Sequence, residues 1–320
     1  MQKAYVHSSF GGPEVEHFAD LPVPVPGPGQ LLVAVRAAGV NPVDWKRRSG
    51  RRPAGAPAVV LPAVMGGEAA GEVAAVGPGV TGFAVGDAVL GGPFAGGYAE
   101  YTLLAAAAAV RKPPEVSWTD AAVLPIAAAT GYGAVRQLAL PPGATLLITG
   151  VGGGVGVAAA QVAVHLGLSV VGSCAEDKRG AVEALGVAHV ASGPGLAARV
   201  RAAAPAGIDG VLDLVGGDVL HEVAGLPAGP GRLVSGADRE AVRALGGAPV
   251  GPVRDPELLG AVVELVRTGA LDPMVTRVVP FARAAEAVRA VEGGHTLGKV
   301  VLEMPPAPDA RVPEIPPVSG

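Results

Sequence analysis

The sequence predicts an α/β protein with a β-rich first part and a doubly wound parallel sheet behind it. Residues 1–118 contain short apolar runs between Gly and Pro turns, which is typical of a small barrel or sandwich. From Ser117 onward, strand-like and helix-like runs alternate. There are 49 glycines and 31 prolines, but half of the 320 residues are hydrophobic and 16% are charged, so disorder is excluded for most of the chain.

The β-rich part contains three segments that we expect to be strands. Each is apolar and is bounded by Gly or Pro; they are residues 31–37, 71–76 and 87–90. The proline-rich residues 21–29 are expected to form an extended connector or an edge, because proline has no N–H to donate to a central strand.

The second part is expected to alternate strands with helices. The predicted strands are residues 145–149, 169–173, 189–191, 210–214 and 232–235, and the predicted helices are 155–166, 177–185 and 196–204. Two further helices, 257–267 and 282–291, and a strand at 299–302 follow. We therefore divide the chain into residues 1–118, 119–258 and 259–304, with a flexible proline-rich tail at 305–320.

The charge and cysteine content exclude several functions. With 24 basic and 28 acidic residues the net charge is −4, so no basic stripe is available for nucleic acid. The single cysteine, Cys174, excludes an intramolecular disulfide and a four-cysteine zinc site, and it fits a reducing compartment such as the cytoplasm. The first residues lack the apolar core of a signal peptide.

Residues 137–175 contain no Asp, Glu, Lys or Arg and are long enough to suggest a membrane span. However, Pro141, Pro142 and the glycines between 150 and 156 would break one long helix. A buried parallel strand followed by a buried helix explains the same hydrophobicity, so no membrane segment is expected.

The glycine-rich loop after residue 149 points to a dinucleotide. It follows a predicted strand, opens a predicted helix and has G-x-x-G-x-x-G spacing; its residues are Gly150, Gly153, Gly154, Val155 and Gly156. The first glycine permits an unusual turn, the middle one lets a pyrophosphate approach, and the last lets the helix pack on the strand. The helix N-terminus then offers N–H groups to the phosphates.

The end of the next strand favours NADP(H) over NAD(H). An Asp or Glu normally binds the ribose 2′-hydroxyl of NAD there, but this strand ends at Ser173 without an acid. Lys178 and Arg179 follow, and two cations suit a 2′-phosphate. Glu176 and Asp177 argue in the other direction, and the two cations alternatively belong to a solvated helix face.

Together, the ordered motifs resemble the medium-chain dehydrogenase/reductase superfamily, and within it the zinc-independent quinone oxidoreductase branch. The resemblance covers residues 1–304. It rests on residues 39–50, 61–77, 85–89, 96–101, 129–135, 212–217, 231–236 and 269–302, together with the glycine loop. It implies a GroES-like β-barrel domain, an inserted Rossmann domain and a homodimer.

The resemblance also implies roles for individual residues. Asn41 corresponds to a position near the nicotinamide and the substrate, and Thr130 to a contact of the nicotinamide amide. Lys46 and Arg52 stand where relatives often carry tyrosines that line the substrate pocket, so these cations suggest an anionic or more polar substrate. Two further residues are implied in cofactor binding: Val215 and Gly236.

No catalytic metal is expected. In zinc alcohol dehydrogenases of this superfamily, the positions of Asn41, Gly67 and Ile126 would hold cysteine, histidine and cysteine. Glu68 remains, but one carboxylate does not make a zinc site, and the six histidines lack metal-ligand spacing.

These observations predict an NADPH-dependent reductase that transfers hydride to a quinone or an α,β-unsaturated carbonyl without zinc. Asn41, Lys46 and Arg52 are the candidate donors for the developing negative charge. Three alternatives remain: an enoyl reductase of a natural-product or polyketide pathway that acts on acyl thioesters, a redox-inactive NADPH-binding protein, and a non-redox cyclase.

Overall fold

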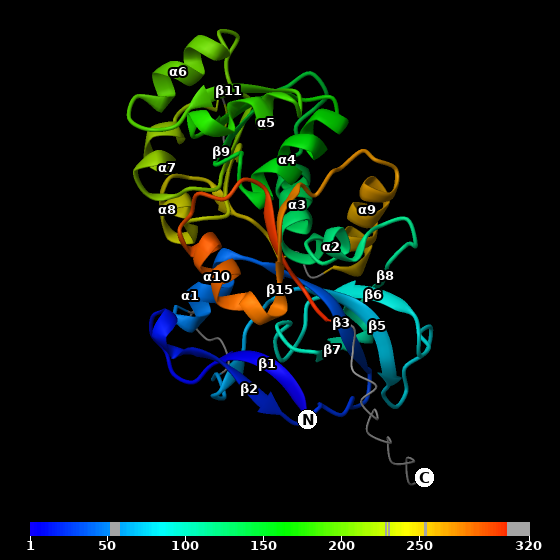
Figure 1. Cartoon of the computed structure of the whole chain (residues 1–320). Coiled ribbons are helices and arrows are strands. Elements are labelled where there is room, and N and C mark those ends of the chain that lie inside the picture. The colour runs from blue at the N-terminus through cyan, green and yellow to red at the C-terminus, as the bar shows by residue number, and fades with distance from the viewer. Residues whose placement is uncertain (52–57, 228, 230, 253–254, 306–320) are drawn as a thin grey trace. The chain divides into compact units, whose positions relative to one another are not determined.

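The computed structural model describes residues 1–51, 58–227, 229, 231–252 and 255–305 (Figure 1). Its internal contacts divide the chain into two units. Unit 1 comprises Met1–Ile126, Arg254–Val263 and Val275–Gly320, and unit 2 comprises Ala127–Val253 and Glu264–Met274. The predicted tail, except for Pro305, lies outside the described residues.

Unit 1 is built on two sheets. The larger has the order β15-β16-β3-β5-β6-β8, with β7 also paired to β3, and the smaller has the order β2-β1-β4. The strands are β1 (Gln2–His7), β2 (Glu16–Leu21), β3 (Gln30–Val40), β4 (Ala63–Val64), β5 (Ala69–Val76), β6 (Ala88–Gly91), β7 (Tyr101–Ala105), β8 (Val110–Arg111), β15 (Val275–Pro280) and β16 (Lys299–Glu303). The three strands predicted in this part are confirmed as β3, β5 and β6.

The helices of unit 1 are short. Those that lie wholly within it are α1 (Pro42–Arg48), α2 (Trp118–Ala121) and α10 (Ala284–Glu292), with 3-10 turns at Pro13–Val15, Ala106–Ala108 and Phe281–Arg283 and a π-turn beginning at Leu124. The longer helix α9 (Pro256–Arg267) begins in unit 1 and ends in unit 2. One face of α10, carrying Ala284, Ala287, Val288 and Val291, is buried in a core shared with β3 and β16. This period of three and four residues is the amphipathic pattern that the sequence indicated.

Unit 2 contains a six-stranded parallel sheet with the order β11-β10-β9-β12-β13-β14, coloured green to yellow in Figure 1. Its strands are β9 (Thr145–Thr149), β10 (Ser169–Cys174), β11 (Val187–Ala191), β12 (Gly210–Asp213), β13 (Leu233–Ser235) and β14 (Ala248–Pro249). Its helices are α3 (Ala129–Leu138), α4 (Gly154–His165), α5 (Arg179–Glu183), α6 (Leu196–Ala203), α7 (Gly217–Val223) and α8 (Arg239–Ala244). The strand order reverses beside β9, which confirms the predicted doubly wound sheet.

Several sequence-based boundaries were wrong. The predicted helix 177–185 is a 3-10 turn at Glu176–Lys178 followed by the short α5, and the predicted helix 282–291 begins as a 3-10 turn. The helix predicted at residues 257–267 is confirmed as α9 (Pro256–Arg267). Helix α1 was not predicted at all, because seven residues are too few for a clear period.

The charge-free stretch 137–175 forms the end of α3, β9, α4 and β10, which is the strand-and-helix arrangement that the sequence indicated. Within the described residues, no helix is both long enough and apolar enough to cross a membrane.

Helix α1 is fixed at its N-terminal end by Asp44. The carboxylate Oδ2 accepts bonds from the Asn41 backbone N–H at 2.9 Å and from the Tyr98 hydroxyl at 2.7 Å. Asp44 is buried, and within the described residues its Oδ1 has no hydrogen-bond partner. Burial raises the pKa of Asp44 from 3.8 to about 6.

The C-terminal end of α1 is fixed by a buried ion cluster. The Arg48 guanidinium, 1% exposed, pairs with Glu16 of β2 and, at 2.7 Å, with Glu292 of α10. Glu16 also accepts a 2.7 Å bond from the Tyr5 hydroxyl. The cluster joins β1, β2, α1 and α10, so the position of α1 depends on Arg48.

Replacing Arg48 by methionine should lower the free energy of unfolding of unit 1 by about 3–5 kcal/mol, because Glu16 would remain buried without its cation. Both tryptophans, Trp45 and Trp118, belong to unit 1, so tryptophan fluorescence during urea unfolding reports this unit. The control is Arg283→Met, which breaks an exposed pair with Glu286 and should leave the free energy of unfolding nearly unchanged. Equal losses in the two variants would contradict the structural role of Arg48.

Replacing Asp44 by asparagine should change how stability depends on pH. The folded chain holds the Asp44 proton to higher pH than the unfolded chain, so this stabilisation is complete below about pH 4 and is lost as pH rises through about 6. Asparagine cannot ionise, and its oxygen can still accept both bonds. Relative to the wild type, Asp44→Asn should therefore gain about 3 kcal/mol between about pH 4 and about pH 8 in urea unfolding. The same difference at both pH values would exclude titration of Asp44.

Candidate active site and cofactor site

The side chain of Asn41 lies in a buried polar network of unit 1. Its Nδ2 donates to Glu68 Oε1 at 2.6 Å, and its Oδ1 accepts from Lys299 Nζ at 2.6 Å. Lys299 Nζ also donates to Val40 O at 3.0 Å and to Glu68 Oε1 at 3.1 Å. The antiparallel pairing of Val300 with Val40 places Lys299 beside the end of β3.

Glu68 is fully buried, and both of its oxygens are used. Oε1 accepts from Asn41 and Lys299, and Oε2 accepts from the backbone N–H of Ile126 at 2.7 Å. The ammonium of Lys299, 4% exposed, supplies the opposite charge that a buried carboxylate requires.

The residues at the three positions that would hold zinc ligands in zinc alcohol dehydrogenases do not fit a catalytic zinc ion; they are Asn41, Gly67 and Ile126. A Cβ on Gly67 would lie 2.8 Å from Ile126 Cδ1, so the isoleucine fills the room that a histidine at position 67 would need. The Glu68 carboxylate is already bound by three donors, and Oδ2 of the neighbouring Asp44 is bound by two. Across the described ranges, no three His, Cys, Asp or Glu side chains gather as metal ligands.

The structure describes the surroundings of two of the three predicted catalytic residues, Asn41 and Lys46. Asn41 is buried in the network with Glu68 and Lys299. Lys46 is half-buried on α1, with its ammonium 5.7 Å from the centre of the Trp45 ring. Arg52 lies outside the described residues. The structure therefore brings Asn41 together with Glu68 and Lys299.

The glycine loop of unit 2 connects β9 to α4. Gly150 adopts a φ of +67°, a conformation that favours glycine. A Cβ on Gly156 would lie 2.5 Å from Gly150 O, so only glycine lets α4 pack this closely on the turn. Gly153 is different, because its Cβ would meet only Gly150 O at an ordinary 3.5 Å. The packing of the chain does not require glycine at 153, the residue before α4, so the absence of a side chain leaves room there for a ligand to approach.

A buried carboxylate organises the strand ends beside this loop. Asp213 Oδ1 accepts from Thr149 Oγ1 at 2.8 Å and from the N–H of Val215 at 3.1 Å, and Oδ2 accepts from Ser235 Oγ at 2.6 Å. Its backbone oxygen accepts from Gly236 N–H at 2.9 Å. Asp213 thus joins the carboxyl ends of β9, β12 and β13, and the half-exposed Val215 follows this junction.

The two cations that follow β10, Lys178 and Arg179, have different surroundings. Ser173 is buried at the end of the strand, and Lys178 lies beside the loop, because a Cβ on Gly152 would come 2.8 Å from Lys178 Cδ. Arg179 instead forms exposed ion pairs with Glu176 at 2.6 Å and with Glu183 at 3.2 Å.

Thr130 lies on α3, which packs against α4. A Cβ on its neighbour Gly131 would lie 2.8 Å from both Val155 O and Ala159 N, so the glycine allows the two helices to approach closely. Thr130 therefore lies near the helix that begins at the glycine loop.

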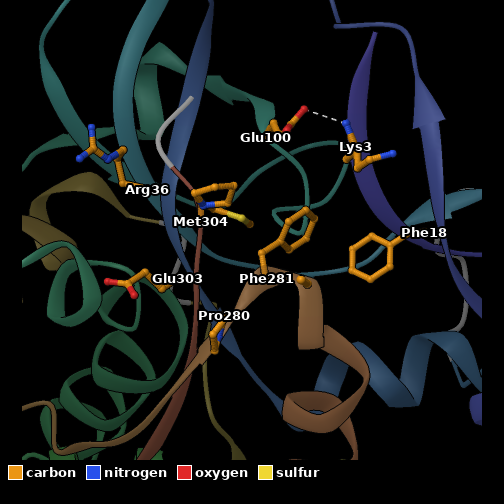
Figure 2. A pocket seen from close by; sticks show the side chains of 10 residues that line it. Lys3, Phe18, Arg36, Glu100, Pro280, Phe281, Glu303 and Met304 are labelled. Atoms are coloured by element: carbon orange, nitrogen blue, oxygen red, sulfur yellow. Dashed lines mark hydrogen bonds between the residues drawn. The ribbon is translucent and has the colours of Figure 1, made fainter. Parts of the chain in front are cut away.

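A separate pocket of about 760 Å³ lies in unit 1 (Figure 2). Phe18 and Phe281 line one side of it and pack edge to face, with their ring centres 5.2 Å apart. Met304 and Pro280 also line it. None of the residues that the sequence analysis assigned to a site lines this pocket.

Sequence reasoning missed Lys299 and Asp213 as organising residues. Each carried a signal, because each is a charged residue within an apolar run, GKVVL for Lys299 and VLDLV for Asp213. A charge in such a run is expected to be buried and paired.

Two families match the chain. Residues 27–114 match the alcohol dehydrogenase GroES-like domain, and residues 185–302 match the zinc-binding dehydrogenase family. The second description contains the word zinc, but the residues around Glu68 described above do not provide a zinc site.

The relatives include both modular synthases and small enzymes. "Polyketide synthase GfsB" of Streptomyces halstedii is 36% identical over 303 residues, which is 89% of this chain but 5% of that protein. "Quinone oxidoreductase" of Homo sapiens is 37% identical over 175 residues, 53% of this chain and 51% of that protein. The chain therefore spans about half or less of these curated relatives.

A solved mycobacterial structure, of Rv1454c complexed with NADPH, covers nearly the whole fold. It is 29% identical, with a TM-score of 0.84, over 95% of this chain and 100% of that one. The parallel sheet, the mixed β unit and these matches agree, and the chain belongs to the medium-chain dehydrogenase/reductase superfamily, with a GroES-like domain and a Rossmann-type domain.

Proposed function

We propose that this protein is a zinc-independent, NADPH-dependent reductase that transfers hydride to an activated carbon–carbon double bond or a quinone. The observation that carries the proposal is the glycine turn at the point where the strand order of the parallel sheet reverses, with Gly153 free of packing constraints. Dinucleotides bind at such switch points in doubly wound sheets.

The residues around the turn fit the cofactor. The first N–H groups of α4 suit the pyrophosphate, and Asp213 holds the neighbouring strand ends in place. The end of β10 has no acid to exclude a 2′-phosphate, and Lys178 lies beside the loop, so we assign the 2′-phosphate to Ser173 and Lys178. Arg179, already paired with two glutamates, is assigned to the helix surface.

The centre around Glu68 favours reduction of an activated acceptor over oxidation of a simple alcohol. Oxidation of a simple alcohol is assisted by a Lewis acid, and the side chains around Glu68 do not form a ligand set for one. When bound, the nicotinamide supplies the hydride, which adds to the β-carbon of an enone or to a quinone. The chain must then provide donors for the oxygen that becomes negative and a path for one proton. We assign the first task to Asn41 and Lys46.

Acyl thioesters are the second candidate substrate class. The match to a polyketide synthase over 89% of this chain supports an enoyl reductase that acts on carrier-bound or coenzyme-bound intermediates. Lys46, where relatives often carry a tyrosine, suits a substrate with an anionic group. The proposal also includes a cytoplasmic homodimer, for which the resemblance and the single cysteine speak.

The test is the oxidation of NADPH, followed by absorbance, with a panel of quinones, enones and enoyl thioesters. We expect turnover with at least one class, and a preference for NADPH over NADH of tenfold or more, about 1.4 kcal/mol, because of the 2′-phosphate contact. Tight NADPH binding without turnover of any acceptor would contradict the reductase and favour a redox-inactive protein or a cyclase.

Two neighbouring variants provide the matched control for the cofactor. Lys178→Ala should weaken NADPH binding about tenfold and leave NADH binding nearly unchanged, whereas Arg179→Ala should change neither, because it removes only exposed ion pairs. Equal effects of Lys178→Ala on both nucleotides would contradict the assignment of the 2′-phosphate.

A further inference from the structure

The carboxamide of Asn41 is held between a buried cation and a buried anion. Its Oδ1 accepts a hydrogen bond from Lys299 Nζ at 2.6 Å, and one of its two N–H groups donates to Glu68 Oε1, with Nδ2 and Oε1 2.6 Å apart. Rotating the carboxamide by half a turn would place its oxygen against the carboxylate and its NH₂ against the ammonium. Both contacts would be repulsive at low dielectric, so the orientation of the side chain is fixed.

The hydrogen-bonding capacity of Lys299 is fully used in this network. An ammonium has three donors, and here they meet three acceptors, which are Val40 O, Asn41 Oδ1 and Glu68 Oε1. Glu68 is likewise held on its other oxygen by the Ile126 N–H. Neither charged group can turn away without leaving a buried polar atom unpaired, so the network is stiff.

The second Nδ2–H of Asn41 is the group that this arrangement leaves available. The carboxamide has two N–H donors, and the structure uses one of them among the described residues. The ammonium at Oδ1 draws electron density toward the oxygen and makes the remaining N–H a stronger donor. A donor of fixed direction and increased strength is what a developing oxyanion requires.

We propose that Lys299 is a positioning residue for the reaction, which fixes and polarises the Asn41 carboxamide so that its free N–H is directed to the reacting group. The inference rests on the proposed function, since Asn41 is assigned there as a donor to the oxygen that becomes negative. Glu68 is the partner that sets which end of the carboxamide faces which charge.

Three variants separate positioning from folding. Lys299→Met removes the cation and leaves Glu68 buried without it, so this variant should be unstable. The double variant Lys299→Met/Glu68→Gln removes both charges and should recover most of the lost thermal stability. The control is Lys3→Met, which breaks an exposed pair with Asp20 and should change neither stability nor turnover.

The decisive comparison is between stability and turnover in the double variant. We expect its melting temperature to return toward the wild-type value while kcat stays reduced about tenfold or more, with little change in the KM for NADPH, because a glutamine does not fix the carboxamide. Recovery of kcat together with stability would overturn the proposal, since Lys299 would then only balance the charge of Glu68.

A second measurement does not depend on activity. The side-chain amide signals of Asn41, assigned by their loss in Asn41→Ala, should show one proton shifted and slowly exchanging in the wild type, and neither property in the double variant. Unchanged signals in the double variant would overturn the proposal. A wild-type chain that reduces no acceptor would contradict the proposed function instead, and the amide signals would still decide whether Lys299 fixes Asn41.

Discussion

The buried negative charge of Glu68 is the constraint on which the rest of unit 1 depends. A carboxylate without access to water is tolerated only when it is paired and hydrogen-bonded, and three donors from distant parts of the chain meet this need. They come from the end of β3, the start of β16 and the turn at Ile126. Satisfying one charge therefore fixes where three segments meet, and helix α1 begins at that point.

Unit 2 also contains a buried carboxylate that is bound by donors from several segments. Asp213, fully buried, receives bonds from Thr149, Ser235 and the backbone N–H groups after β12, and thereby joins the carboxyl ends of three adjacent strands. Each unit thus uses one internal carboxylate to hold its own backbone segments in place.

The features that depend on local residue patterns could be predicted from the sequence. The parallel sheet and its glycine loop follow from periodicity, from the positive φ that Gly150 adopts and from the close packing that Gly156 allows. The network of Lys299 with Glu68 could not be predicted, because the two residues are 231 positions apart and only the strand pairing brings them together. The same holds for Arg48 and Glu292. The short helix α1 was not predicted, and the helix containing α5 was predicted too long, because tertiary packing sets the length of such short elements.

We propose that the centre around Glu68 works with the internal cation of Lys299 and without a metal. The most direct measurement is the turnover of NADPH with the best acceptor after exhaustive dialysis against a chelator, together with the zinc content of the same sample. We expect unchanged turnover and far less than one zinc per chain. Loss of turnover on chelation, restored by added zinc, would contradict it.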